Sequence, residues 1–331
     1  MSSLLNIQNL FLKNLKDLAL PSQARIIIAV SGGLDSVALA HLFAMTKEKH
    51  QLKLELAHIT HNVRSFDAGQ KDYAIILDIS KRYALPLHHY SLEKDKIQQQ
   101  YGKEQDLRTV RRCWLESLCS SSMDKIALAH HQNDHIETVF MRLNQRYPLK
   151  GLTGIQKERH PFIRPLIEIP KIELRQFLVS HHFIWAEDST NNDLTILRNK
   201  TRKIIQQITP YWPTMEQSVI HLSRIIMENQ ELIDNLLHQA LEQSEWSNSY
   251  FRHPYAHFKQ QHPIVQRELI YHWFNQLMKG KIRADYRLPQ KFVNSINLNP
   301  HGSILLRGHG FEIKRVKKDL IIQKTIIKEK I

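Results

Sequence analysis

The chain has 331 residues, which exceeds the usual size of one hydrophobic core and predicts two domains. Its 46 Lys and Arg residues against 32 Asp and Glu residues give a net charge of +14, which favours an anionic partner such as RNA over a basic surface that serves only solubility. Two cysteines without a CxxC spacing exclude a disulfide scaffold and a cysteine zinc site, and the lack of a long apolar run or a cleavable leader pattern predicts a cytoplasmic protein without membrane contact.

Short apolar runs and amphipathic segments alternate along the first 180 or so residues. An amphipathic start (Leu4, Ile7, Leu10, Phe11, Leu15) precedes expected strands near 25–30, 53–59, 86–90, 125–129 and 162–167. Expected helices fall near 35–49, 67–83, 104–119, 132–145 and 170–182. This order predicts an α/β fold with a doubly wound, mainly parallel sheet. Such sheets bind ligands at the carboxyl ends of their strands, so we expect functional side chains just after the strands.

A glycine turn follows the first strand, in the segment Ser31-Gly32-Gly33-Leu34-Asp35-Ser36. Glycines let the backbone approach phosphate oxygens, and the helix that follows directs N–H donors and its positive dipole end toward an anion. A carboxylate at Asp35 would repel a polyphosphate unless a divalent cation lay between them, so Asp35 indicates bound Mg²⁺. The segment lacks the Gly-Lys-Ser/Thr of the common phosphate loop and the GxGxxG of dinucleotide folds. It predicts a nucleotide-phosphate site, with an ordinary strand-to-helix turn as the alternative.

The second and fourth strands end in polar segments, His58–Arg64 and Ala129–Thr138. Asp134 and Glu137 are three residues apart on the helix that begins there, so both carboxylates can face one substrate or one metal. A solvated acidic helix face is the alternative. We interpret the histidines of this segment as backbone anchors or nucleotide contacts rather than zinc ligands, because no cysteine or ligand spacing accompanies them.

The helix expected near 104–119 carries Arg108 and, on the same face, Arg111 or Arg112. Paired guanidinium groups suit a triphosphate or an RNA phosphate. The alternative is an exposed face held by salt bridges.

Six ordered blocks of the chain resemble the tRNA(Ile)-lysidine synthetase family of the PP-loop ATP pyrophosphatase superfamily. The blocks are SGGLDS at 31–36, HITHNVR at 58–64, the helix with Glu104, Arg108 and Arg111, HHQNDHIET at 130–138, KGLTGI with RPL at 150–166, and WAEDSTN with RNKTR at 185–202. The last block is the most specific, because other PP-loop enzymes do not share it. Together the blocks cover about residues 25 to 210.

The resemblance implies a PP-loop domain of the adenine nucleotide alpha hydrolase-like type that uses ATP and Mg²⁺. Members adenylate the C2 oxygen of the wobble cytidine in tRNA(Ile) with a CAU anticodon. The ε-amine of L-lysine then attacks C2, which forms lysidine and releases AMP after pyrophosphate. By resemblance, ATP would be held by Ser31, Gly32, Gly33, Leu34, Asp35, Ser36 and His58, with Asp35 also on the metal, and the reaction centre would contain Asp35, Arg108, Asp134 and Glu137.

The chain departs from the family pattern at three places. Gln145-Arg146-Tyr147-Pro148 stands where members have a glycine-rich segment, Asn133 replaces one residue of an acidic pair, and Thr60 replaces an aspartate. These departures leave two alternatives open: a noncatalytic tRNA-binding relative, and another PP-loop tRNA-modifying enzyme such as a thiolase. Since Asp35, Asp134 and Glu137 are intact, we rank an active lysidine synthetase first.

The sequence changes character near Pro210 and Pro213, so we expect a catalytic domain at 1–212 and a small, mainly helical tRNA-contacting domain at 213–331. Apolar residues at helical spacing between Val219 and Leu241 predict a long helix whose stripe is core. Another helix is expected near 263–279, and a closing β hairpin should turn at Val316–Asp319. Longer family members carry a further C-terminal domain, so we expect tRNA contacts to come from these two domains. The oligomeric state stays open, with a homodimer as one option.

Overall fold

We describe the chain from a computed structural model, which covers residues 2–61, 66–92, 104–145, 149–187, 195–247, 249–277, 287–298, 304–308 and 311–324. Three segments singled out in the sequence therefore lie outside the described residues: Asn62–Arg64, Arg146–Pro148 and Asp188–Asn191. The chain divides into two compact units. The first comprises Met1–Tyr147 and Gly151–Ser223, and the second comprises Pro148–Lys150 and Arg224–Ile331.

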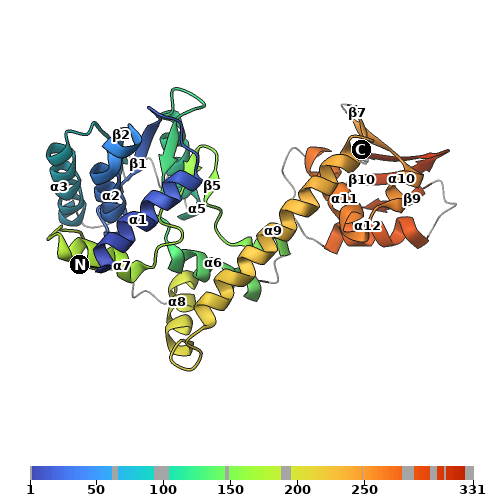
Figure 1. Ribbon diagram of the computed structural model, residues 1–331. Coiled ribbons are helices and arrows are strands. Elements are labelled where there is room, and N and C mark those ends of the chain that lie inside the picture. Colours follow the sequence, from blue (N-terminus) through green and yellow to red (C-terminus); the bar gives the residue numbers. More distant parts are fainter. Residues whose placement is uncertain are drawn as a thin grey trace. The chain divides into compact units, whose positions relative to one another are not determined.

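The first unit is an α/β domain built on one sheet (Figure 1). Its strands are β1 (Arg25–Ala29), β2 (Lys53–His61), β3 (Leu87–Leu92), β4 (Lys125–Ala127), β5 (Glu158–Arg159) and β6 (Phe162–Ile163). They lie in the order β3-β2-β1-β4-β6-β5, with parallel pairs throughout except the edge pair β5–β6. The predicted doubly wound, mainly parallel sheet is confirmed, and each of its first four strands lies where the sequence indicated.

Helices cover both faces of this sheet. They are α1 (Ser2–Asp17), α2 (Leu34–His50), α3 (Phe66–Tyr83), α5 (Glu104–Ser117), α6 (Gln132–Asn144), α7 (Lys171–Ser180) and α8 (Leu197–Ile208), with the short 3₁₀ turn η1 (Leu149–Thr153) after α6. Ile26 and Ile28 of β1 join a core with side chains of α1, α2, α3 and α7, whereas Ile27 joins a smaller core with Leu115 of α5. Successive side chains of a strand point to opposite faces, which is why the apolar run of β1 is buried on both sides.

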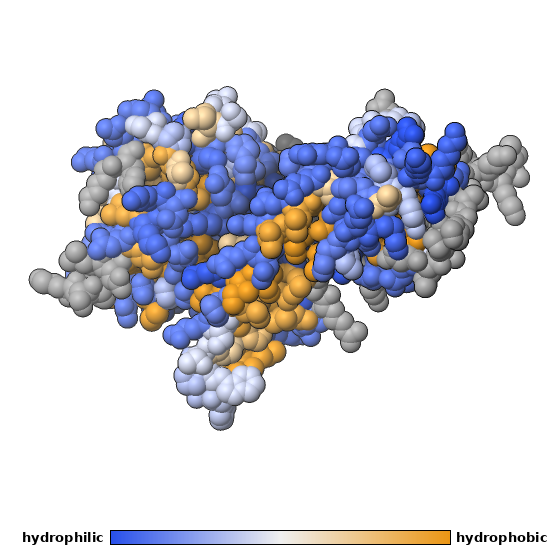
Figure 2. Space-filling view, turned by 45° about the vertical axis from the view of Figure 1, so that its right-hand side comes forward, coloured by the Kyte–Doolittle hydropathy of each residue, from blue (hydrophilic) through white to orange (hydrophobic). Residues whose placement is uncertain are grey.

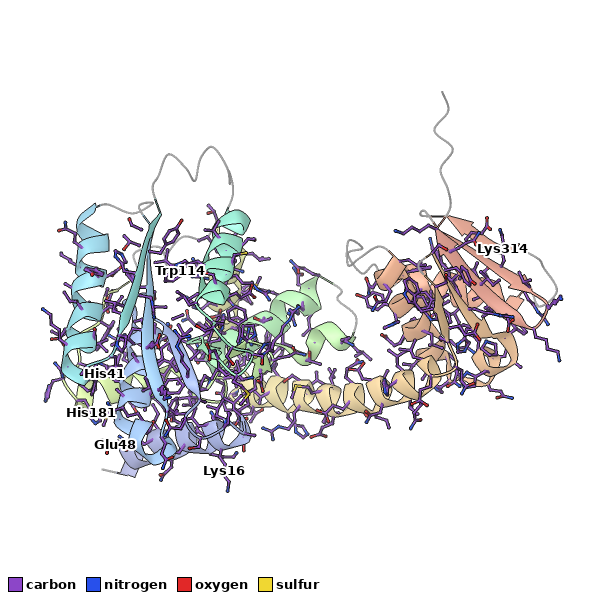
Figure 3. The ribbon with its side chains drawn as sticks, turned by 90° about the horizontal axis from the view of Figure 1, so that it is seen from above. Lys16, His41, Glu48, Trp114, His181 and Lys314 are labelled. Carbon is purple, nitrogen blue, oxygen red and sulfur yellow. The ribbon has the colours of Figure 1, made fainter. Side chains whose placement is uncertain are left out.

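The helical layer on the first face includes a stack of rings at α2 and α7. His41 lies parallel to Phe183, with ring centroids 3.5 Å apart, and His181 also stacks on Phe183, with a centroid distance of 5.4 Å. Figure 3 labels both histidines. Burial lowers the pKa of His41 to about 4, so the ring is neutral at pH 7 and packs as an apolar group.

At the amino ends of the strands, Arg25 is paired with two carboxylates. Its guanidinium donates to Glu55 of β2 at 2.6 Å and to Asp124, next to β4, at 2.8 Å. Glu55 also contacts His88 of β3 at 2.6 Å. The hydrogen bonds with Glu55 raise the pKa of Arg25 above its usual range. Hydrogen bonds at this end of the sheet therefore link β1, β2, β3 and the residue before β4.

The second unit contains an antiparallel sheet and a helical core. Its elements are the later part of α9 (Met215–Leu241), then β7 (Glu245–Ser247), β8 (Tyr250–Pro254), α10 (Tyr255–Gln260), α11 (Pro263–Leu277), α12 (Arg287–Leu298), β9 (Ile304–Gly308), β10 (Phe311–Val316) and β11 (Asp319–Lys324). The strand order is β7-β8-β11-β10-β9. The predicted hairpin is present as β10–β11 with its turn at Lys317-Lys318, and it belongs to a sheet of five strands. The sequence did not indicate β7 and β8 because each is short and lacks a long alternating pattern.

The apolar stripe of α9 differs from its expectation. Leu237, Ala240 and Leu241 pack against the core of the second unit, but Leu222, Ile225, Leu232 and Leu236 are exposed, and Leu232 keeps 59% of its surface. Helical spacing shows that these residues share a face but does not provide a neighbour to cover it. The expectation that the whole stripe is core was therefore wrong.

Candidate active site

The glycine turn between β1 and α2 is held by the two serines that flank it. Ser36 Oγ accepts from the Ser31 N–H at 3.1 Å and donates to the Gly33 carbonyl at 3.0 Å. Gly32 has φ +90°, and a Cβ there would lie 3.0 Å from the Asp72 Cβ, so both conformation and space require glycine. The serine hydroxyls thus fix the loop, and the first-turn N–H groups of α2 begin at Leu34.

Two other segments fix the same turn from outside. The Ala186 N–H donates to the Gly32 carbonyl at 2.9 Å, in an isolated parallel bridge between Gly33 and Ala186. His58 of β2 lies beneath, with Nδ1 2.8 Å from the Val30 carbonyl oxygen, and burial lowers the pKa of His58. A neutral ring with a protonated Nδ1 donates this hydrogen bond. The structure therefore places His58 as a support of the loop backbone, with Nε2 3.3 Å from Thr60 Oγ1.

Asp35, in the first turn of α2, lies beside His131 and Lys171. Its Oδ2 is 3.5 Å from His131 Nε2 and 3.3 Å from Lys171 Nζ. Its Oδ1 is buried and has no hydrogen-bond partner within the described part of the chain. Burial opposes the charged form, but His131 and Lys171 hold the pKa of Asp35 below its usual range. Asp35 is therefore an ionised carboxylate with one buried oxygen available.

His131 joins Asp35 to Asp134. It is the N-cap of α6: its Nδ1 accepts from the Asp134 N–H at 3.4 Å, and Asp134 Oδ2 accepts from the His131 N–H at 3.1 Å. The same Asp134 oxygen lies 3.6 Å from His131 Nε2. This reciprocal capping box satisfies two N–H groups at the helix start. It brings the carboxylates of Asp35 and Asp134, which the sequence predicted separately, to the same imidazole nitrogen.

Glu137 is buried one turn further along α6 and faces two arginines of α8. Its Oε1 lies 2.7 Å from Arg202 Nε, and its Oε2 lies 3.0 Å from Arg198 Nε. Burial disfavours the charged guanidinium, but Glu137, and then Asp134 and Asp35, raise the pKa of Arg202 above its usual range. All three predicted carboxylates therefore share one neighbourhood, which Arg202 also enters.

A cationic side of the site surrounds His130. Burial lowers the pKa of His130 to about 4; Asp134 opposes this shift, whereas the charges of Arg164, Arg198 and Arg111 reinforce it. His130 Nδ1 is buried without a hydrogen-bond partner among the described residues. These arginines come from three elements or loops, so the site has an acidic side and a basic side.

Arg108 is the predicted site residue that the structure does not join to the others. It is exposed on α5, and its charge contributes to lowering the pKa of Arg111. No hydrogen bond or ion pair between described residues links Arg108 to Asp35, Asp134 or Glu137. Conversely, no sequence pattern indicated that Lys171 lies beside Asp35. The i, i+4 spacing of Arg198 and Arg202 does indicate that both guanidinium groups lie on one face of α8.

The GLTG loop after α6 is fitted to His135. Gly154 has φ +70°, and a Cβ there would lie 2.3 Å from the His135 ring. The ring accepts from the Ile155 N–H at 3.2 Å and contacts Ser223 Oγ at 2.8 Å. His135 is thus a backbone anchor. Among the described residues, no group of three or more His, Cys, Asp or Glu side chains could hold a metal ion by itself.

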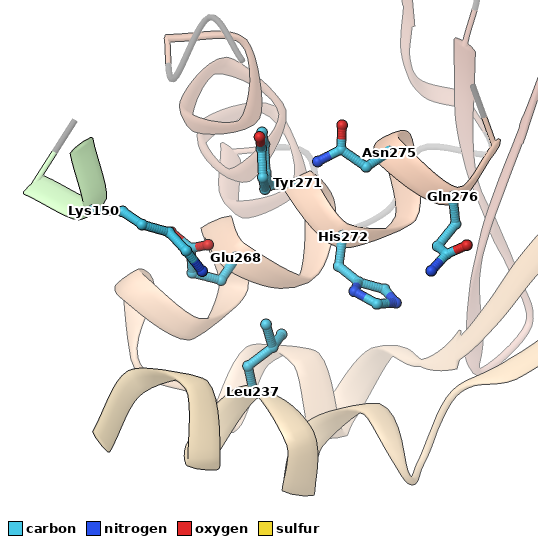
Figure 4. A pocket seen from close by; sticks show the side chains of 7 residues that line it. All are labelled: Lys150, Leu237, Glu268, Tyr271, His272, Asn275 and Gln276. Carbon is cyan, nitrogen blue, oxygen red and sulfur yellow. The ribbon is translucent and has the colours of Figure 1, made fainter. Parts of the chain in front are cut away.

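The second unit has a pocket of about 340 Å³ between α9 and α11 (Figure 4). Glu268, His272 and Asn275 of α11 line it opposite Leu237 of α9. None of the predicted site residues lines this pocket. Within the helices that the structure describes, none combines the length and apolarity that a bilayer crossing requires.

Curated relatives match most of the chain. A tRNA(Ile)-lysidine synthase from Enterococcus faecalis is 29% identical over 85% of this chain and 62% of its own length. One from Thermotoga sp. (strain RQ2) is 27% identical over 78% of this chain and 62% of its own, and one from Caldanaerobacter subterraneus subsp. tengcongensis is 27% identical over 93% and 67%. The chain spans about 62% of the length of the first two relatives.

One solved structure has a similar fold over part of this chain. The U34-tRNA thiolase NcsA from Methanococcus maripaludis matches with a TM-score of 0.55 and 15% identity, over 68% of this chain and 79% of that one. The family described as "PP-loop domain" matches residues 4–208. The resemblance drawn from the ordered blocks is thereby confirmed, and the chain belongs to the PP-loop family.

Proposed function

We propose that the chain ligates L-lysine to C2 of the wobble cytidine of tRNA(Ile) with a CAU anticodon, forming lysidine and releasing AMP and pyrophosphate. The observation that carries this proposal is the clustering of Asp35, Asp134 and Glu137 around His131 and Arg202, beside the glycine turn. The curated relatives supply the substrate class by name, and the PP-loop match supports the use of ATP. A tRNA substrate also suits the net charge of +14 and a cytoplasmic location.

The residues of the turn fit the triphosphate of ATP. The N–H groups of the first turn of α2, together with those of Gly32 and Gly33, can donate hydrogen bonds to phosphate oxygens, and Ser31 offers a hydroxyl. Asp35 fits Mg²⁺, because its buried Oδ1 has no other partner among the described residues and carboxylate oxygen is the ligand that Mg²⁺ prefers. When bound with the nucleotide, Mg²⁺ would neutralise phosphate charge. Mg²⁺ in nucleotide sites is usually held by one or two carboxylates together with phosphate oxygens, and Asp35 could supply one such carboxylate.

Asp35, Asp134 and Glu137, which we call the acidic cluster, fit the lysine ammonium group. A lysine side chain has an ordinary pKa near 10.4, so its amine must lose a proton before or during attack. The C–N bond to C2 forms as the C2–O bond to AMP breaks, and the proton passes to a carboxylate. Both oxygens of Glu137 are engaged by arginines, and Asp35 serves the metal. We therefore assign proton acceptance to Asp134 and the positioning of Arg198 and Arg202 to Glu137.

The arginines near His130 form the basic side of the site and fit the anionic parts of the substrates. Arg111, Arg164 and Arg198 converge on His130, whose neutral ring adds no positive charge. Guanidinium groups suit the α-carboxylate of lysine or a phosphate next to the target base. A substrate with a cationic end and an anionic end would thus meet matching charges.

Lysine incorporation tests the proposal. The full chain is incubated with ATP, labelled L-lysine and a CAU-anticodon tRNA transcript, and label on the RNA is measured. We expect incorporation that requires ATP and is lost when uridine replaces the wobble cytidine. The Asp35→Ala variant should no longer release pyrophosphate. No incorporation together with retained tRNA binding would instead favour a noncatalytic tRNA-binding relative.

Asn133 motivates that alternative, because it replaces a carboxylate of the family pattern. In the structure, Asn133 Oδ1 accepts from the Lys171 N–H at 2.9 Å, at the start of α7. An acceptor at this position supports the helix whether it is an amide or a carboxylate. The replacement therefore leaves the acidic cluster intact, which favours the active enzyme. A thiolase would instead be expected to transfer sulfur to the same transcript without consuming lysine.

A further inference from the structure

The turn between α8 and α9 carries two exposed aromatic rings. Tyr211 keeps 82% and Trp212 keeps 64% of its surface exposed. The turn forms the tip below α8 in Figure 1, and the pale end of the same tip is visible in Figure 2. Large aromatic side chains in water contribute nothing to a core, so their exposure as an adjacent pair indicates a contact surface.

The turn holds both rings on an ordered backbone. The Tyr211 and Trp212 N–H groups donate to the Ile208 carbonyl at 2.9 and 3.0 Å, and the Met215 N–H donates to the Trp212 carbonyl at 3.0 Å. Pro210 and Pro213 flank the pair and restrict the chain further. A ligand that stacks on these rings would therefore lose little affinity to ordering of the backbone.

The outward face of α8 leads to the rings and is basic. Its inward face buries Thr201 and Ile205 and directs Arg202 to Glu137. On the other face, Lys200 and Lys203 are exposed. No Asp or Glu occurs between residues 194 and 215 of the sequence. The rings are thus approached along a surface that attracts phosphate groups.

We propose that Tyr211 and Trp212 stack on unpaired bases of the bound RNA, with Lys200 and Lys203 contacting its backbone. We call these four residues the aromatic platform. Aromatic rings beside cations are the usual means of holding single-stranded nucleic acid, because every base has a face that can stack. The platform rests on the proposed function only for the identity of the RNA. Lys200 and Lys203 flank Arg202 in the sequence, and the end of α8 at Ile208, just before the two rings, is about 9 Å along the helix from Arg202. Nucleotides beside a base at the acidic cluster can therefore reach the platform.

A second copy of the chain is the competing occupant. A symmetric contact through this turn would bring Lys200 and Lys203 of each copy toward those of the other, and like charges oppose such a contact. An RNA strand meets the same lysines with opposite charge. The charge of the platform therefore favours RNA.

The test measures binding of a labelled CAU-anticodon tRNA to the full chain by fluorescence anisotropy. For the Tyr211→Ala/Trp212→Ala variant we expect the Kd to rise about 10-fold or more, with little change in its salt dependence. The Tyr211→Phe/Trp212→Phe variant, which keeps two stacking rings, should stay within about 3-fold of the unmodified chain. The matched control is Met123→Ala, which removes a large side chain that is 57% exposed just before β4, at the amino ends of the strands, and should leave Kd unchanged.

The lysines are tested separately. In the Lys200→Ala/Lys203→Ala variant, the slope of log Kd against log salt should fall by about 1 to 2, because two phosphate contacts are lost. Thermal unfolding of the alanine variants should match that of the unmodified chain, since all four side chains are exposed. Unchanged tRNA affinity in the double aromatic variant would overturn the proposal. So would a chain that is dimeric by light scattering and becomes monomeric in that variant.

Failure of this inference can be told apart from failure of the proposed function. If the chain binds tRNA through the rings but attaches no lysine, the aromatic platform stands and lysidine formation is wrong. If lysine is attached with normal KM for tRNA in the double aromatic variant, lysidine formation stands and the platform is overturned.

Discussion

The buried Glu137 of α6 forms an ion pair with the partly buried Arg202 of α8, with 2.7 Å between Oε1 and Nε. The residues are 65 positions apart in the sequence. Arg198 contacts the other oxygen of the same carboxylate. A buried charge is tolerated when it is paired and hydrogen-bonded, and removing one partner leaves the others uncompensated. Glu137 therefore holds α8 on α6 and fixes two arginines at the edge of the acidic cluster.

The Glu137→Gln variant should lower the free energy of unfolding by about 3 kcal/mol, because two arginines lose their counter-charge in a buried place. The measurement is urea denaturation. Glu158→Gln is the control, since Glu158 pairs with Lys125 at 2.6 Å but is itself exposed, and its loss should change stability by less than about 1 kcal/mol. A Glu137→Gln protein of normal stability that has lost lysine incorporation would show that Glu137 acts in the chemistry instead.

The Lys171→Met variant should weaken binding of Mg²⁺-ATP about 10-fold. Lys171 lies 3.3 Å from Asp35, and its charge would attract the triphosphate as well as keep that carboxylate ionised. Equilibrium binding of a fluorescent ATP analogue measures the effect. Lys157→Met is the matched control, because Lys157 forms a similar pair with Asp17 at 2.8 Å outside the site. Tighter nucleotide binding in Lys171→Met would contradict the assigned role.

The Asn133→Asp variant should keep lysine incorporation within about 2-fold of the unmodified chain, because aspartate accepts the Lys171 N–H as asparagine does. Asn133→Ala should instead lose about 1 kcal/mol of stability through the missing cap. Comparing the two variants by pyrophosphate release and thermal unfolding separates the cap from the charge. A large gain of activity in Asn133→Asp would mean that the missing carboxylate limits the chemistry.

The second unit should lose stability as the pH falls below about 6.5. His253 is buried, its Nδ1 lies 2.8 Å from Ser244 Oγ, and burial lowers its pKa to about 4. The unfolded chain binds a proton near pH 6.5, whereas the folded chain resists it down to about pH 4, so stability rises with pH across this window. The full difference corresponds to at most about 3 kcal/mol.

Urea midpoints of the full chain between pH 7 and pH 4 measure this effect, followed by a signal from the second unit such as the fluorescence of the buried Trp273. The His253→Gln variant should be less stable at pH 7 and should show a flatter dependence on pH. An equally steep loss of stability in His253→Gln would assign the acid sensitivity to other groups.

The sequence predicted the elements whose signals are local. The apolar run of β1, the glycine turn with the apolar helix α2, and the amphipathic helices α3 and α6 each follow from residues close together in the chain. The acidic carboxylates were also found, because the carboxyl ends of parallel strands meet at one edge. What each carboxylate contacts was beyond reach. Lys171 lies 136 positions from Asp35, and no periodicity connects them.

The apolar stripe of α9 shows what helical periodicity cannot predict. Helical spacing correctly predicted the helix Met215–Leu241, but periodicity reports which residues share a face and not what covers that face. The exposure of Tyr211 and Trp212 is likewise a property of the folded turn. Two aromatic residues between prolines are equally compatible with burial in a core, so the sequence did not predict their exposure.

The two ends of the first sheet are chemically unlike. At the amino ends, the guanidinium of Arg25 is paired with both Glu55 and Asp124. At the carboxyl ends, Asp35 Oδ1 and His130 Nδ1 have no hydrogen-bond partner within the described residues. Paired charges therefore mark one end of these strands, and polar atoms that a ligand could still bind mark the other. Substitutions at the amino ends of the strands should therefore be able to raise stability without lowering turnover. Substitutions at the carboxyl ends should be able to change substrate preference without lowering the melting temperature.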